Sequence, residues 1–417
     1  MGQSTRTDAD FDFKGRLIVS VSDADMVASA YLDGQLGRVE GKDALSVIRL
    51  DKAVSELKAV EIPASNSVTG PPSSVAVSPD GHYAIVIETR GGRPLSSPNT
   101  LFSDLPSGKV ITVIDLTDPD HLKIHQKIDG PQRPLSVTFS KDGSLVVITY
   151  RPQDANQSPL AMYQFTGGRL ANLSLPDVPG YVAGDIINGA VFHPVEPMIA
   201  LLNVTKSMLV FFKLTKTNDV ISLTSWGNSV VIDKEPFKAC FTPNGRFVVV
   251  NAMYPGSVRG SVTSVGLSIE TASDGSPVHQ IVSRALAGVL PEGLTMSPDG
   301  RWVVTTNLEQ STQPFTSPKQ GFFASLSLMH LNPESGLLSW VGDFPFDGIL
   351  PESVVFDNSG RFLAVANFDH YDLKRPAGSI DFWRLTSDYF DPKRVQLVKT
   401  NYSVPVTRGV HSMVIVR

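Results

Sequence analysis

The stretch PEGLTMSPDGRWVVTTN occupies residues 291–307 and decides the fold, because its pattern returns along the chain. A short apolar segment leads into a Ser-Pro-Asp-Gly turn, and a second apolar segment follows the turn. Glycine readily adopts a positive φ and aspartate closes tight turns with its side chain, so this pattern predicts a β-hairpin. Clear copies begin near residues 74, 136, 239 and 353, and a weaker copy begins near residue 190.

The copies recur about every 50 to 60 residues, a period that is typical of propellers with several strands in each blade. A seventh copy is divided between the two ends of the chain. Residues 410–415 supply its first strand, and residues 13–19 supply its turn and second strand. Pairing of the two ends in one blade locks such a ring and leaves no open edge.

The third strands can be counted independently of the hairpins, and there are again seven. They are expected at residues 45–50, 110–116, 160–165, 208–214, 262–269, 324–331 and 379–385. We therefore predict an all-β fold, a seven-bladed β-propeller with four antiparallel strands in each blade.

Length and composition set the broad class of the protein. A chain of 417 residues favours two or three domains by length alone, but a blade buries its faces only against its neighbours. We therefore expect one propeller domain over residues 11–417 and a flexible tail over residues 1–10. A net charge of −5 without a run of Lys or Arg argues against nucleic acid as a partner. The single cysteine, Cys240, excludes an internal disulfide.

The chain carries no membrane signal. No apolar run approaches the ~18 residues of a membrane span, so we expect no membrane partner. The first ten residues also lack the apolar centre of a signal peptide. The expected location is the cytoplasm, or another compartment if a leader has been removed. The oligomeric state is left open.

Two sets of loops meet at the mouth of the central channel, where propellers usually bind their ligands. The longest insertions fall in the set that joins second and third strands, at residues 23–43, 88–108, 308–321 and 367–378. Because loops of this length are more often functional than not, a lid over the mouth is one hypothesis, and disorder is the other.

The residues that enter the inner strands give the strongest chemical signal. In the register of Pro351, Glu352 and Ser353, the seven mouth positions are Ser73, Leu135, Asn188, Phe237, Glu292, Glu352 and His411. Three consecutive blades thus direct two carboxylates and an imidazole into one small space. Arg133 and Arg408 lie two and three residues before their own mouth positions.

This grouping suits proton transfer on an anionic molecule. Two neighbouring acids raise the pKa of one of them, and histidine can carry a proton in either direction. Arginine offers a fork of donors for a carboxylate or a developing oxyanion. We predict that the catalytic residues are Glu292, Glu352, His411, Arg133 and Arg408. The alternative is a solvated polar channel whose charges satisfy one another.

A second ring of polar residues follows the second strands. This ring and the mouth position Asn188 together supply the predicted substrate contacts. They are Arg90, Arg151, Asn188, Asn251, Tyr254, Asn307, Asn367 and His370. Asparagine at a strand end commonly bonds its own turn, so that interpretation is preferred for most of the asparagines. Arg90, Arg151 and His370 are better candidates for ligand contact, because a turn does not need side chains of these types.

No organic cofactor is expected, because the proposed proton transfers need none. Oxygen ligands from Asn188, Glu292 and Glu352 could hold a divalent cation, which is a further hypothesis. The sequence contains no Gly-x-Ser-x-Gly, His-Glu-x-x-His, Cys-x-x-Cys, phosphate-loop or dinucleotide motif.

Residues 291–307 and 351–367 follow the pattern Pro-x-x-Val-x-Phe/Val-Ser-Pro-Asp-Gly-x-x-Val-x-Val-x-Asn in large part. This pattern resembles the repeat of the lactonase-like seven-bladed propellers. That group includes bacterial 6-phosphogluconolactonases, fungal carboxymuconate lactonizing enzymes and YVTN surface-layer repeats. The resemblance covers nearly the whole chain as architecture.

The resemblance also implies roles for the predicted residues. In the carboxymuconate enzymes, His, Glu and Arg side chains at the channel mouth do the chemistry. By analogy, His411, Glu292 or Glu352 would transfer the proton, and Arg133 and Arg408 would bind carboxylate. The leading hypothesis is an enzyme for lactone hydrolysis, lactonisation or a related lyase or isomerase step on a small oxygenated, anionic substrate. The alternative is a non-catalytic binding module for a protein, a peptide or a small ligand.

Overall fold

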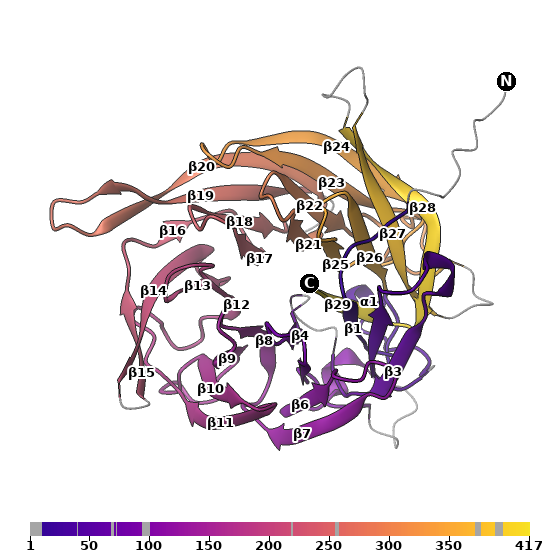
Figure 1. Ribbon diagram of the computed structural model, residues 1–417, viewed down its shortest axis with the longest axis horizontal. Coiled ribbons are helices and arrows are strands. Elements are labelled where there is room, and N and C mark those ends of the chain that lie inside the picture. Colours follow the sequence, from indigo (N-terminus) through magenta and orange to yellow (C-terminus); the bar gives the residue numbers. More distant parts are fainter. Residues whose placement is uncertain are drawn as a thin grey trace.

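The computed structural model describes residues 11–417 except 40, 68–70, 72, 94–100, 218–219, 255–257, 372–376 and 388–394. The expected tail at residues 1–10 therefore lies outside the described part. Seven antiparallel sheets surround a central channel like the blades of a propeller, as Figure 1 shows. The predicted fold class is confirmed.

Each blade runs from an inner strand at the channel to an outer strand at the rim. Blade 1 contains β4 (Val75–Val77), β5 (Tyr83–Ile87), β6 (Val110–Asp115) and β7 (Lys123–Asp129). Blade 2 contains β8 (Pro134–Phe139), β9 (Leu145–Tyr150), β10 (Leu160–Thr166) and β11 (Arg169–Ser174). Blade 3 contains β12 (Ile187–Phe192), β13 (Met198–Asn203), β14 (Met208–Thr217) and β15 (Val220–Ser225), and β16 (Val230–Val231) also pairs with β14.

The remaining blades follow the same plan. Blade 4 contains β17 (Pro236–Phe241), β18 (Phe247–Ala252), β19 (Arg259–Thr271) and β20 (Pro277–Val289). Blade 5 contains β21 (Pro291–Met296), β22 (Trp302–Asn307), β23 (Ala324–Leu331) and β24 (Leu338–Phe346). Blade 6 contains β25 (Ser353–Phe356), β26 (Phe362–Asn367), β27 (Gly378–Ser387) and β28 (Val395–Val406).

Blade 7 joins the two ends of the chain. Its order is β29 (Val410–Val416), β1 (Leu17–Ser22), β2 (Ala44–Arg49) and β3 (Ala59–Pro63). The innermost strand thus comes from the C-terminal end and the next one from the N-terminal end, with Leu17 opposite Val416. This pairing closes the ring as the divided seventh copy predicted.

The repeated turn has the side-chain chemistry that the sequence suggested. At residues 297–300 the Ser297 hydroxyl donates to Asp299 Oδ1 at 2.5 Å, and the Arg301 N–H donates to the same oxygen at 3.1 Å. Gly300 follows with a φ of 74°, a conformation that glycine adopts without steric cost. The turns that begin at Ser78, Ser140 and Thr242 repeat the first of these bonds.

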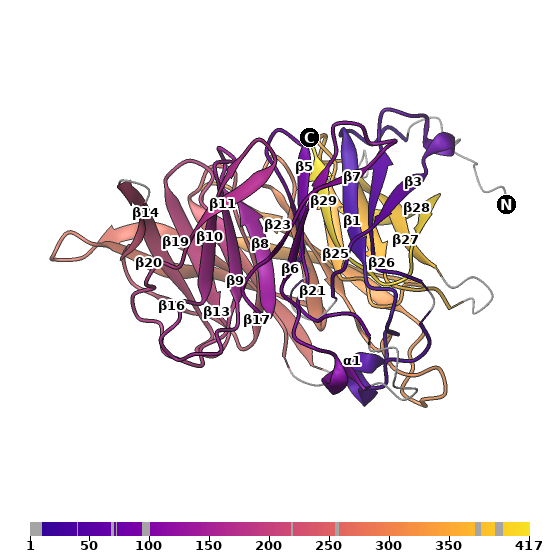
Figure 2. The same ribbon diagram turned by 90° about the horizontal axis from the view of Figure 1, so that it is seen from below.

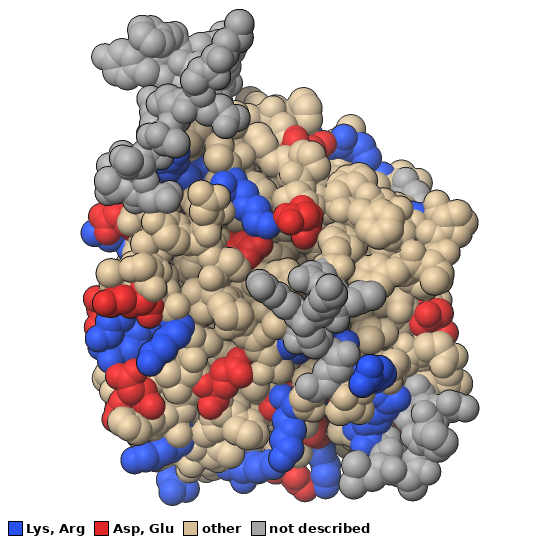
Figure 3. Space-filling model, turned by 90° about the vertical axis from the view of Figure 1, so that its right-hand side faces the viewer, with Lys and Arg blue, Asp and Glu red and all other residues tan. Residues whose placement is uncertain are grey.

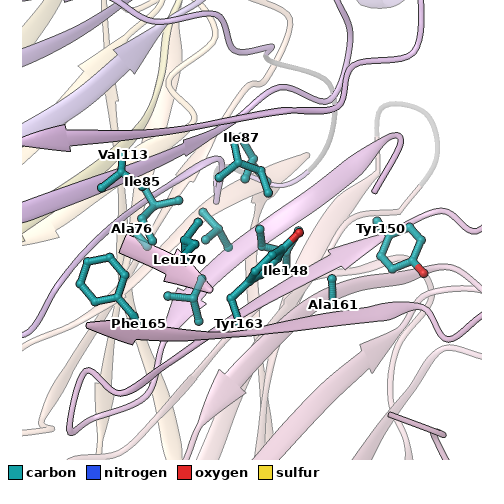
Figure 4. Packing of buried hydrophobic residues seen from close by; sticks show 13 residues of the cluster. Ala76, Ile85, Ile87, Val113, Ile148, Tyr150, Ala161, Tyr163, Phe165 and Leu170 are labelled. Carbon is teal, nitrogen blue, oxygen red and sulfur yellow. The ribbon is translucent and has the colours of Figure 1, made fainter. Parts of the chain in front are cut away.

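The hydrophobic core lies between adjacent blades. One cluster between blades 1 and 2 includes Ile85, Val113, Ile148 and Tyr163, whose side chains Figure 4 shows packed between the sheets. Ile85, Val113 and Ile148 are fully buried, and burial of each such side chain contributes about 1.5–3 kcal/mol. Since each blade supplies one wall of two clusters, no blade is expected to be stable alone.

The described parts of the long insertions project from one face of the ring. The short helix α1 (Ala30–Asp33) and the 3₁₀ turn Phe102–Asp104 lie there, and Figure 2 shows α1 beyond the strand ends of this face. A second 3₁₀ turn, Val54–Glu56, precedes β3. On the side shown in Figure 3, acidic and basic side chains are interspersed. None of the helices in the described part has the length and apolar character needed to cross a membrane.

Candidate functional site

The mouth positions lie at irregularities in the strand pairing. In five blades the inner strand has a β-bulge, and the residue left out of the pairing is Leu135, Asn188, Phe237, Glu292 or His411. Glu352 directly precedes the first paired residue of β25. A bulge re-aims one side chain without ending the strand, and bulges are common beside active sites. The predicted register of the mouth positions is therefore visible in the structure.

Neighbouring side chains satisfy the backbone groups around these bulges. Asn251 accepts a bond from the Lys238 N–H at 2.8 Å and donates to the carbonyl oxygens of Pro291 and Glu292 at 2.8 and 2.9 Å. The Gly293 N–H donates to Thr306 Oγ1 at 2.9 Å. The bulge that carries Glu292 is thereby fixed from two blades.

A residue with positive φ precedes most inner strands. Two positions before the mouth residue, φ is 57° at Arg133, 54° at Glu235, 53° at Leu290, 47° at Leu350 and 88° at Gly409. Such a conformation costs a non-glycine residue about 1–2 kcal/mol. Because five blades share it, this strain belongs to the architecture of the blade and not to the chemistry of one residue.

Two carboxyl groups and a phenol converge between blades 5 and 6. Glu352 is fully buried, Glu292 is 8% exposed, and the Tyr31 hydroxyl lies 3.5 Å from Glu352 Oε1. Burial raises the pKa of Glu292 to about 8. Burial and the charges of Glu292 and Asp23 raise the pKa of Glu352, although its bond to Tyr31 lowers it. The structure therefore brings Glu292 and Glu352 together, as the sequence predicted.

Tyr31 and Asp23 are members of this group that the sequence did not indicate. Burial and the charges of Glu352, Glu292 and Asp23 raise the pKa of Tyr31 well above its usual value. Both residues belong to the insertion at 23–43, whose long loop has no periodic pattern that fixes the place of a side chain. The sequence marks the insertion at 23–43 as a candidate lid by its length alone.

The described residues of the insertions at 23–43, 88–108 and 308–321 pack together with residues 367–371, and we call this assembly the cap. Its shared apolar cluster includes Met26, Leu36, Leu105, Leu308 and Phe368. Backbone bonds also join the first two insertions, since Gln35 bridges Leu101 and the Phe102 N–H donates to the Gly34 oxygen at 2.8 Å. Tyr31 reaches Glu352 from this cap, so the cap lies over the side of the mouth that holds the two carboxyl groups.

His411 is held in one tautomer behind the mouth. The Asn66 amide donates to the carbonyl oxygens of Ser22 and Ala64, so its Oδ1 faces His411 Nε2, at 2.7 Å, as an acceptor. The proton of the neutral imidazole therefore lies on Nε2. Burial lowers the pKa of His411 to about 3, and Nδ1 has no hydrogen-bond partner among the described residues. Its catalytic role stays a prediction.

The two predicted catalytic arginines lie in different surroundings. Arg408 is 4% exposed, and its guanidinium donates to the carbonyl oxygens of Ala24 and Arg38 at 3.3 and 3.0 Å. It also lies 3.9 Å from Asp369, so its visible contacts hold the cap. Arg133 instead lies beside Arg90 and Arg151, where blades 1 and 2 meet. The structure thus separates the five predicted catalytic residues into several groups.

The other predicted substrate contacts occupy varied positions. Asn188 lines a cavity of about 450 Å³ beside the inner strands of blades 1–4 and 7. The amides of Asn251, Asn307 and Asn367 are buried and bond to protein groups, which corresponds to the structural interpretation of these asparagines. His370 lines a separate cavity of about 270 Å³ beside Arg408, and Tyr254 lies half-buried after β18.

A further group of carboxylates includes none of the predicted cation ligands Asn188, Glu292 and Glu352. Among the described residues, Asp23, Asp25 and Asp43 place ligand oxygens within 4.8 Å of one another. Backbone N–H groups of Ala24 and Asn66 donate to Asp43, and burial with the charge of Asp25 raises its pKa to about 7. These two bonds hold the Asp43 carboxyl in place.

Comparison with known proteins places the fold. Neither the family models nor the curated proteins compared with the chain gives a match at the level of sequence. Among solved structures, the periplasmic gluconolactonase of Pseudomonas aeruginosa aligns with a TM-score of 0.65 at 16% identity, over 96% of this chain and 99% of that one. The two proteins share one fold.

Two further structures give the same result. A Bacteroides uniformis protein, provisionally described as a 6-phosphogluconolactonase, has a TM-score of 0.61 at 16% identity and covers 97% of this chain and 100% of its own. A functionally unknown protein from Desulfotomaculum acetoxidans has a TM-score of 0.61 at 13% identity, over 96% and 99% of the two chains. The resemblance inferred from the repeat is thus confirmed for the fold.

Proposed function

We propose that this protein is a lactonase-type enzyme that acts on a small, oxygenated, anionic molecule at the channel mouth. The observation that carries the proposal is the buried pair Glu292 and Glu352 with Tyr31, because carboxyl groups with raised pKa values are suited to general acid–base work near neutral pH. The class of substrate comes from the gluconolactonase that shares the fold.

Lactone hydrolysis needs two proton transfers. One carboxylate takes a proton from water as its oxygen adds to the lactone carbonyl, and the other carboxyl gives a proton to the ring oxygen as the ring C–O bond breaks. Two acids that repel each other's charge hold one proton between them over a wide pH range, which supplies both roles. The same steps in reverse give lactonisation, and proton removal from carbon would give an isomerase or lyase step.

The remaining residues have supporting roles in this proposal. Arg133, with Arg90 and Arg151, binds the anionic group of the substrate. Arg408 holds the cap through the carbonyl oxygens of its loops. His411 is neutral and bonded to Asn66, so we assign the proton transfers to the glutamates. This chemistry requires neither a metal ion nor an organic cofactor.

The test is a screen of lactones with the carboxylic acid product followed by pH-stat titration. Glucono-δ-lactone and its 6-phosphate are the first substrates to try. Glu292→Gln and Glu352→Gln should each lower kcat/KM at least a hundredfold, the lower range for general acid–base catalysis. The matched control is Glu235→Gln, an exposed glutamate two positions before the mouth residue of blade 4. Unchanged turnover in both site variants would overturn the proposal.

A non-catalytic binding module is the second candidate, and a group of exposed aromatic side chains in and beside the cap favours it. Phe315, Phe322 and Phe323 are 42, 56 and 40% exposed, and the rings of Phe315 and Phe322 lie 5.9 and 5.5 Å from that of Tyr371. Exposed aromatic side chains are common in surfaces that bind other molecules. Absence of turnover on every lactone, with the protein folded, would favour this role.

A further inference from the structure

Three arginines come together where blades 1 and 2 meet at the mouth. Arg90 follows β5, Arg133 precedes β8 and Arg151 follows β9. Backbone contacts join them in series, because Arg90 bridges Ser107, the Arg133 N–H donates to the Gly108 oxygen at 2.8 Å, and the Arg151 N–H donates to the Arg133 oxygen at 3.1 Å. The framework of two blades thus fixes the three residues side by side.

No carboxylate neutralises this group among the residues that the structure describes. The Arg90 guanidinium donates to the Leu105 carbonyl oxygen at 3.2 Å and lies over the Phe102 ring at 5.7 Å. The Nε of Arg151 is buried without a hydrogen-bond partner in the described part of the chain. A buried donor without a partner costs about 1–3 kcal/mol, more when it is charged, so an arriving acceptor would be stabilised here.

The charges of the three arginines also act on one another. Burial and the charge of Arg133 lower the pKa of Arg90. Burial and the charges of Arg133 and Arg90 lower the pKa of Arg151. An anion between the guanidiniums would relieve this repulsion, because arginine forks bind carboxylate and phosphate oxygens in pairs.

We propose that Arg90, Arg133 and Arg151 form one receptor for a doubly charged oxyanion. A singly charged carboxylate would leave two positive charges unbalanced, whereas a dianion balances two of the three. Its source is either the anionic group of the substrate or a free anion that acts as an effector. The proposal depends on the proposed function only for the first of these sources.

One member of the receptor, Arg151, lines a cavity of about 390 Å³ that can hold the rest of a ligand. Tyr150, Gln132, Gln153 and Leu173 also line it, as does Asp129, whose carboxylate is paired with Lys109. The Gln153 amide donates to Gln132 Oε1, so these two side chains present an ordered pair of amides. Because Leu173 and Leu175 also line the cavity, it offers a ligand apolar as well as polar contacts.

The receptor shares Arg90 with the cap that covers the carboxyl pair, because this arginine belongs to the insertion at 88–108. Arg90 lies over the Phe102 ring, whose centroid is 6.3 Å from that of Tyr31, and Tyr31 reaches Glu352. A ligand that orders Arg90 would therefore also order this part of the cap. Anion binding should raise the thermal stability of the protein as well as give a heat of binding.

The test is calorimetric titration of the whole chain with inorganic phosphate and sulfate at pH 8, with acetate at matched ionic strength as the singly charged comparison. We expect both dianions to bind at least tenfold more tightly than acetate. Arg133→Met and Arg151→Met should each weaken dianion binding at least tenfold. Arg169→Met, which changes an exposed arginine of the same blade, should stay within twofold.

Arg151→Lys keeps the charge but loses the planar fork, and it serves as a second variant if a methionine variant fails to fold. It should still weaken phosphate binding several-fold. Equal binding in the wild type and these variants, or equal affinity for acetate and sulfate, would overturn the proposal. Competition between phosphate and a turned-over lactone would identify the substrate group as the ligand, and binding without competition would identify an effector. Phosphate binding without any lactone turnover would refute the proposed function and leave the receptor intact.

Discussion

Replacement of Glu292 by glutamine tests the buried carboxyl pair without any substrate. Glutamine has nearly the shape of a protonated glutamate and cannot lose a proton. The pKa of Glu292 is about 8 in the folded protein, against 4.5 for an ordinary glutamate. Between these two values the folded state keeps a proton that the unfolded state has lost.

The sign and size of the effect follow from this difference. The stabilisation is fully present below pH 4.5 and is lost as the pH rises towards 8, at up to about 1.4 kcal/mol for each pH unit. Over the whole interval the wild-type free energy of unfolding should fall by about 5 kcal/mol relative to the Glu292→Gln variant. The change also relaxes Glu352, because the charge of Glu292 helps to raise the pKa of that residue.

Urea denaturation at pH 5, 6, 7 and 8, followed by tryptophan fluorescence, gives the required free energies. The wild-type curve against pH should be steeper than that of Glu292→Gln. An exposed glutamate supplies the control, since Glu196→Gln should reproduce the wild-type slope. Parallel curves for the wild type and Glu292→Gln would show that this carboxyl group does not hold its proton in the folded state.

Three further changes test other parts of the structure. His411→Gln should reduce the loss of stability at acid pH, because the buried imidazole has a pKa of about 3 and destabilises the fold as the pH falls from 6.5. Acid denaturation of the wild type and the variant measures this loss. The same dependence of stability on pH in both proteins would contradict the prediction. Gly409→Ala should lower the free energy of unfolding by at least about 3 kcal/mol in urea denaturation, because a Cβ there would lie 1.7 Å from a backbone oxygen of the cap. Gly34→Ala, also at positive φ but in open space, is the control and should lower it by only about 1 kcal/mol. Equal losses in the two variants would refute the clash. Tyr31→Phe should cost about 0.5–1 kcal/mol through loss of its bond to Glu352, and unchanged stability in the same assay would show that the bond contributes nothing.

The fold could be predicted because its signal is local and repeated. Every hairpin carries its own turn residues, as at residues 297–300, and the divided copy at the two ends specified how the ring closes. The position of Glu292 could be predicted for the same reason, since the bulge occurs at the same register in several blades. Because the blades repeat, residues at equivalent positions of the seven sequence copies occupy equivalent places around the channel mouth.

The rest of the site depends on contacts that no repeat encodes. Tyr31 reaches Glu352 only because the cap packs through Leu36, Leu105 and Phe368, which are distant in sequence. Arg408 lies three residues before its mouth position, and the sequence did not show that loop carbonyl oxygens would hold its guanidinium. Irregular loops settle through tertiary packing, so their side chains cannot be placed from periodicity alone.

The bulges at the mouth separate chemistry from architecture. Because the bulged residue takes no part in strand pairing, its side chain can be exchanged while the hydrogen bonds of the blade stay in place. The five blades thus present variable side chains on a constant scaffold. These side chains are Leu135, Asn188, Phe237, Glu292 and His411. A substitution at one of these five positions can therefore change the chemistry of the mouth without breaking the strand pairing of its blade.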